Sequence, residues 1–155
     1  MTLTSVKQYF EDDHARLDSL FAEFQSLKRT DAAAAKQKFN AFLSGLTPPH
    51  IWEEEILFPL FEERTGMSHT GPTEVMRQEH KIINRHLDAI HGKVRAADPE
   101  SDSDEADLLD VLNVHNMKEE RILYPAIDQA LDDDAVKAVE QAMDAIPEER
   151  YAVRD

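Results

Sequence analysis

The stretch HNMKEERILYP, from His115 to Pro125, decides the fold because it has a near copy earlier in the chain, PHIWEEEILFP from Pro49 to Pro59. In each copy a histidine is followed about one helical turn later by glutamates, then by apolar residues and a proline. Residues four apart lie on the same side of an α-helix. The two segments therefore predict two helices that each turn a histidine and a carboxylate toward the core.

Apolar residues recur at spacings of three and four along the rest of the chain, as in amphipathic helices. No stretch alternates apolar and polar residues as a half-buried strand does. We predict an all-α fold, an up-down-up-down four-helix bundle with a short appended C-terminal helix. The expected long helices are Leu3–Lys28, a second one capped by Asp31 and ending at Arg64, Glu74–Ala96 and Glu105–Ala130, with the appended helix capped by one of Asp132 to Asp134.

Four local features are expected to end or interrupt these helices. The proline pair at 48–49 should break the second helix, since neither residue can donate a backbone hydrogen bond. Gly66 should close that helix, and Thr73 is a plausible cap for the third. The acidic segment 98–107 is expected to be a mobile linker.

The composition excludes several classes of protein. The length of 155 residues suits one domain over residues 1–155. Absence of cysteine removes thiolate catalysis, disulfides and iron–sulfur ligation. A net charge of −15 disfavours nucleic acids and anionic membranes as partners. No apolar run is long enough to span a bilayer, and the N-terminus lacks targeting features, so cytoplasmic residence is expected.

The histidines carry the chemistry. When they are sorted by helical face, each of the four long helices has one that looks inward: His14, His50, His80 and His115. The second and fourth helices each add a glutamate one turn along. A buried carboxylate without a partner costs several kcal/mol, so two divalent or trivalent cations bridged by the two glutamates would satisfy all six groups. His69, His86 and His91 are expected outside the site.

The two opening segments, together with GPTEVMRQEHKIINRHL from Gly71 to Leu87, resemble the hemerythrin-like (HHE cation-binding) proteins. The similarity covers about residues 14–131. It implies a four-helix bundle with a non-haem, carboxylate-bridged pair of iron ions. Carried over by position, it implies that His14, His80 and His115 are terminal ligands and that Glu119 is a bridging carboxylate. Imidazole with carboxylate also suits iron on chemical grounds.

The second helix departs from the family pattern. Counting back from Pro59, the position of the family's histidine is taken by Pro49, and the histidine comes one residue late, at His50. The same count makes Glu53 the bridging carboxylate, whereas counting four residues on from His50 gives Glu54. Both glutamates stay candidates at this point.

A second departure bears on function. Oxygen-carrying hemerythrins place a fifth histidine where this chain has Asn84. An iron ion with fewer protein ligands keeps positions open for small molecules. We therefore expect a protein that binds dioxygen or nitric oxide for sensing, storage or delivery. The alternatives are an enzyme acting on peroxide or nitric oxide, an iron-donating repair protein, and a metal-stabilised scaffold or iron store. The sequence does not identify a redox partner.

Side chains next to the candidate ligands complete the expected site. Trp52 and Tyr124 lie near proposed ligands and could take part in redox chemistry, but we expect them to line the wall of the site. Glu79 and Asn84 are placed by their spacing to orient His80 through hydrogen bonds.

Overall fold

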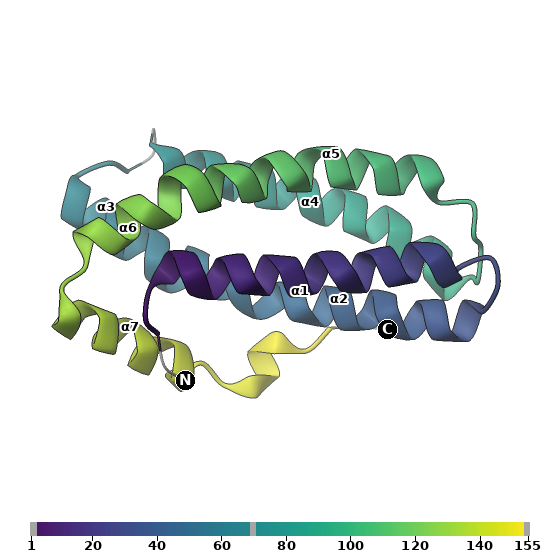
Figure 1. Ribbon diagram of the computed structural model, residues 1–155, viewed down its shortest axis with the longest axis horizontal. Helices are drawn as coiled ribbons and strands as arrows, with labels where there is room; N and C mark the ends of the chain where they lie inside the picture. The colour runs from purple at the N-terminus through teal and green to yellow at the C-terminus, as the bar shows by residue number, and fades with distance from the viewer. Residues whose placement is uncertain (1–2, 69–70, 154–155) are drawn as a thin grey trace.

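The computed structural model describes residues 3–68 and 71–153, and every regular element within them is helical. Four long rods lie side by side (Figure 1). The rods are α1 (Val6–Leu27), then α2 (Ala32–Trp52) continued by η1 (Glu53–Leu57) and α3 (Phe58–Thr65), then α4 (Pro72–Arg95), then α5 (Asp102–Lys118) continued by η2 (Glu119–Leu123) and α6 (Tyr124–Ala130). The prediction of an all-helical bundle is confirmed.

A shorter helix, α7 (Asp133–Ala145), lies alongside the rods near one end, and the 3₁₀ turn η3 (Glu148–Tyr151) follows it (Figure 1). The carboxylate of Asp132 accepts a hydrogen bond of 2.8 Å from the backbone N–H of Ala135, which is the predicted cap. Val139 and Met143 of α7 are buried against the main bundle. The C-terminal helix is therefore part of the same packed structure.

Two of the predicted helix ends are confirmed and one is wrong. Asp31 caps α2 by accepting from the N–H of Ala34, and Gly66 ends α3 with a φ of 74°, which favours glycine. Thr73 is no cap, because α4 begins one residue earlier at Pro72. Its hydroxyl instead donates 2.7 Å to Glu62, which ties α4 to α3.

The predicted break at the proline pair is also wrong, because α2 runs through Pro48 and Pro49 without interruption. A proline inside a helix costs about 3 kcal/mol or more through its missing N–H and its ring. Packing offsets this cost: Leu46 and Pro49 are buried, and Gly45 lets α2 approach Leu17 of α1 more closely than a Cβ would allow. Tertiary contacts thus override the local preference.

The acidic segment 98–107 is not a mobile linker, since α5 begins inside it at Asp102. Lys28, which directly follows α1, is buried at that end of the bundle, and its Nζ lies 2.5 Å from Oε2 of buried Glu105. The hydroxyl of buried Ser101 donates to the same carboxylate oxygen. An ionic cluster therefore holds the start of α5 against the end of α1.

The apolar core consists of two clusters with a polar layer between them. One cluster contains Phe10, Leu57, Met76 and Leu123, and the other contains Leu17, Leu46, Ile83 and Leu112. Each rod contributes one residue of these eight to each cluster, and the inward histidines and glutamates fall between them in sequence. None of the helices within residues 3–68 and 71–153 combines the length and apolarity that crossing a membrane requires.

Candidate metal centre

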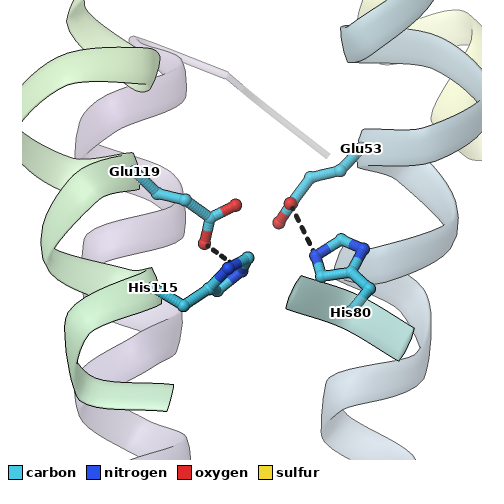
Figure 2. A group of neighbouring side chains, drawn as sticks. All are labelled: Glu53, His80, His115 and Glu119. Carbon is cyan, nitrogen blue, oxygen red and sulfur yellow. Dashed lines mark ion pairs between the residues drawn. The ribbon is translucent and has the colours of Figure 1, made fainter. Parts of the chain in front are cut away.

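Four buried side chains meet in this polar layer: Glu53, His80, His115 and Glu119 (Figure 2). Each offers one ligand atom, and these atoms all lie within 4.8 Å of one another. Nε2 of His80 is 3.4 Å from Oε2 of Glu53, and Nε2 of His115 is 3.2 Å from Oε1 of Glu119. Three of the four rods contribute to this group.

The two carboxylates occupy equivalent positions, because each begins a π-helical turn. The N–H of Phe58 bonds to the carbonyl of Glu53, and that of Tyr124 bonds to the carbonyl of Glu119, five residues back in both cases. A proline follows each turn, and its ring would clash with the carbonyl four residues earlier in a regular α-helix. Such single π-turns are frequent at functional sites.

This geometry separates the two candidate glutamates of the second rod. Glu53 is 1% exposed and points at the cluster, whereas the side chain of Glu54 is 43% exposed. Oε1 of Glu54 lies 3.1 Å from Nδ1 of His80, on the outer side of the imidazole. Glu53 is therefore the inward carboxylate, and Glu54 contacts a histidine from behind.

The other two candidate histidines flank the group. Nε2 of His14 lies 3.5 Å from Oε1 of Glu119, so the remaining rod, α1, also reaches the cluster. The ring of His50 stacks on His80 with centroids 4.0 Å apart and planes within 16°. The structure thus brings all four predicted histidines together around the two inward carboxylates.

Three histidines share one arrangement, with Nε2 toward the centre and Nδ1 held by an outer carboxylate. The Nδ1 atoms of His14, His80 and His115 lie 3.3, 3.1 and 2.9 Å from Glu120, Glu54 and Glu79 respectively. A carboxylate accepting from Nδ1–H leaves the lone pair on Nε2, which is the tautomer that binds a metal.

The partner predicted for Glu79 was wrong. Glu79 directly precedes His80 on α4, but its side chain contacts His115 of α5 instead. The same carboxylate accepts a hydrogen bond of 2.6 Å from Nζ of Lys118. Asn84, the other predicted partner of His80, is exposed. It lines a cavity of about 250 Å³ together with His50 and Glu54.

The pKa values of several cluster residues are shifted far from their usual values. Burial and the adjacent Glu119 carboxylate raise the pKa of Glu53 to about 8. Burial opposes charge on His80 and on His14, but nearby carboxylates raise their pKa values to about 10 and about 9. Burial and the charge on His80 lower the pKa of His50 well below its usual value. Without a cation, the cluster therefore binds protons to balance its carboxylates.

Several atoms of the cluster have no hydrogen-bond partner in the described parts of the chain. They are Oε2 of Glu53, Nε2 of His80, Nε2 of His115 and both carboxylate oxygens of Glu119. Buried polar atoms are nearly always paired, because an unpaired one costs roughly 1–3 kcal/mol. The five atoms converge, and imidazole with carboxylate is a donor set suited to iron, manganese or zinc. These residues fit a cation.

Sequence reasoning gave too little weight to Tyr124. Its buried hydroxyl donates 3.1 Å to Oε1 of Glu53 and lies 3.5 Å from Nε2 of His14. The sequence signal that could have indicated this role is its position five residues after Glu119, a spacing that spans the π-turn. Trp52 does not line the centre in the same way, since its indole N–H donates 2.8 Å to the hydroxyl of Tyr151.

The remaining histidines differ in position. His91 is buried in the other half of the bundle, where its ring lies 5.5 Å from that of Phe39. His86 is half-buried on α4, outside the group of ligand atoms. His69, predicted to lie in a loop, falls outside the described residues.

Comparison with known proteins supports one family. The search of curated proteins and the search of solved structures each gave no match. Residues 6–127 match the family described as the hemerythrin HHE cation-binding domain, a span that holds every residue of the cluster and all four rods except the last three residues of α6. The chain therefore belongs to the hemerythrin HHE cation-binding domain family.

Proposed function

We propose that the protein is a non-haem diiron protein that binds a small diatomic ligand, dioxygen or nitric oxide, for sensing, storage or delivery. The observation that carries this proposal is that buried Nε2 and carboxylate atoms without a hydrogen-bond partner converge on one point of the core. Burying these polar atoms without a cation costs folding free energy, and bound cations would stabilise the folded protein.

In this proposal the four histidines His14, His50, His80 and His115 are terminal ligands, and Glu53 and Glu119 bridge the two ions. Glu54 takes the role of an orienting carboxylate, since it contacts His80 through Nδ1. The bound ions would supply a redox-active centre with open positions for a small ligand. The protein's own residues set the tautomers, exclude bulk water and leave room near His50.

A cavity next to one of the proposed ligands supports a small ligand. A cavity of about 250 Å³ borders His50, and apolar side chains of Leu43, Leu46 and Leu87 form part of its wall. Asn84 lines the same cavity at the position where the oxygen carriers have a further histidine. A neutral diatomic molecule suits this cavity better than a large or highly charged substrate.

The second candidate is an enzyme that reduces peroxide or nitric oxide at the same centre. Tyr124 favours it, because a phenolic O–H within hydrogen-bonding distance of an inward carboxylate can donate a proton and an electron. Simple reversible binding has no need of such a group.

We further infer one domain over residues 1–155 with up-down-up-down topology. Short connections between successive rods and the reversal of the chain at each end in Figure 1 support this topology. Burial of α7 residues against the bundle supports the single domain.

Metal analysis of protein purified without added metal tests the central proposal. We expect about two irons per chain, the stoichiometry of a dinuclear carboxylate site. His115→Ala should lose the iron, whereas His86→Ala should retain it. Visible absorption that appears with oxygen and disappears on its removal supports binding, and rapid loss of added peroxide supports the enzyme. Wild-type protein without iron would refute both.

A further inference from the structure

All the tyrosine and tryptophan residues of the chain gather in one aromatic group. The chain has three tyrosines and one tryptophan, and Tyr9, Trp52, Tyr124 and Tyr151 all belong to this group. They come from α1, α2, α6 and η3, so no local sequence repeat brings them together. We call the path from Tyr124 through Phe10 and Trp52 to Tyr151 the aromatic row.

Each step of the aromatic row is a ring contact. The rings of Tyr124 and Phe10 have centroids 5.2 Å apart, and those of Phe10 and Trp52 are 6.3 Å apart. Trp52 and Tyr151 are 6.2 Å apart and joined by the indole N–H to phenol hydrogen bond of 2.8 Å. Tyr9 contacts both Phe10 and Trp52 and forms a branch.

The row runs from the buried centre toward solvent. Tyr124 is fully buried with its hydroxyl on Glu53, whereas Trp52 and Tyr151 are only half-buried. Aromatic contacts alone do not require this composition. The other half of the bundle is filled by Phe21, Phe24, Phe39 and Phe42, which pack on one another without any tyrosine or tryptophan. Residues that are readily oxidised are thus confined to the half that connects the centre with the surface.

We propose that the aromatic row is an electron-transfer path that carries single electrons from Tyr151 at the surface to the metal centre. The proposal rests on the proposed iron site and on its second candidate function, peroxide reduction, and goes beyond them by assigning a route for electrons. The oxidant is a peroxide reduced at the centre, and the reductant at the surface is a small molecule of the ascorbate class.

The steps balance as follows. Tyr124 gives an electron and its phenolic proton to the peroxide that is reduced at the centre. An electron from Trp52, passed through the contact with Phe10, and a proton from solvent restore Tyr124. Tyr151 then reduces Trp52 and releases its own phenolic proton to water, and ascorbate gives an electron and a proton to Tyr151. Two such transfers, with two protons from solvent, convert one hydrogen peroxide to two waters.

The test begins with iron-loaded protein whose iron content has been measured. The protein is mixed with hydrogen peroxide, frozen within milliseconds and examined by electron paramagnetic resonance, and oxidised residues are mapped by mass spectrometry. We expect a tyrosyl radical and oxidation at Tyr151 in the wild type. Tyr151→Phe should lose the tyrosyl signal at the surface, and Trp52→Phe should lose oxidation at Tyr151 while keeping the radical at Tyr124.

Phe10→Leu and Phe21→Leu form a matched pair, since both replace a buried phenylalanine of α1. Only Phe10→Leu should slow the appearance of oxidised Tyr151, and melting curves show whether each variant is folded. Equal effects in the two variants, or oxidation of Tyr151 that survives Trp52→Phe, would overturn the path. A protein that binds no iron refutes the proposed function, whereas an iron-loaded protein without a radical refutes the path alone.

Discussion

Tyr124 donates a hydrogen bond of 3.1 Å from its hydroxyl to Oε1 of Glu53, so a side chain of one rod fixes a carboxylate of another. Both residues are buried, and both stand at a π-turn. The contact links the two near-copies in the sequence through the layer between the apolar clusters. The orientation of Glu53 therefore depends on the rod that carries Glu119.

Removing this hydroxyl gives the first prediction. Tyr124→Phe leaves Oε1 of Glu53 without its donor and should lower the free energy of unfolding of the metal-free protein by about 1–3 kcal/mol. Urea denaturation measures the change. Tyr151→Phe, which removes the hydroxyl of a half-buried tyrosine, is the control and should have a smaller effect. Equal losses in the two variants would show that the contact with Glu53 has no special weight.

Three successive glutamates allow a graded test of the ligand assignment. Glu53→Gln should prevent formation of the dinuclear centre, because it removes a bridging carboxylate. Glu54→Gln should weaken iron binding about 10- to 100-fold, the usual effect of losing a partner that orients a ligating histidine. Glu55→Gln should change nothing, since Glu55 pairs with Arg150 at the surface. Iron content and competition with a chelator measure all three.

A larger loss of iron in Glu54→Gln than in Glu53→Gln would contradict the assignment. It would mean that the count from His50 sets the bridging residue, as the sequence alone allowed. The structure favours Glu53 because its side chain is buried in the cluster, whereas the side chain of Glu54 is 43% exposed and contacts His80 from the outer side.

Much of the fold and the inward histidines could be predicted from periodicity, because apolar spacing reports which face of a helix is buried. The outer carboxylates could not be predicted. Glu79 lies next to His80 in sequence but contacts His115, since its direction is set by how α4 is rotated against α5. The predicted break at the proline pair was wrong for a related reason. Local rules give the cost of a proline in a helix but not the packing that offsets it.

The raised pKa values predict alkaline sensitivity of the metal-free protein. His14 and His80 have folded pKa values of about 9 and about 10, above the unfolded value of 6.5, and Glu53 has one of about 8, above 4.5. All three hold protons more tightly when folded, so their stabilising effect is present at low pH and is lost as pH rises through about 8 to 10. Each such group contributes a slope of up to about 1.4 kcal/mol per pH unit.

Thermal melts of metal-free protein between pH 7 and 9.5 should therefore show falling stability. Cation-loaded protein, in which the two imidazoles are neutral and Glu53 is deprotonated, should show a much flatter profile. Metal uptake near pH 7 should release protons, which calorimetry in buffers of different ionisation enthalpy detects. Metal binding that strengthens as pH falls would have the wrong sign.

The ionic cluster at the far end of the bundle gives the last prediction, which separates stability from metal binding. Lys28 and Glu105 are both buried, so Lys28→Met leaves a buried carboxylate without its cation and should cost about 3–5 kcal/mol. Asp102→Ala removes a carboxylate whose side chain is 69% exposed and should cost less than about 1 kcal/mol. Urea denaturation measures both, and iron content should stay unchanged, because the cluster lies beyond the second apolar group. Loss of iron in folded Lys28→Met protein would instead show that the two ends of the bundle are coupled.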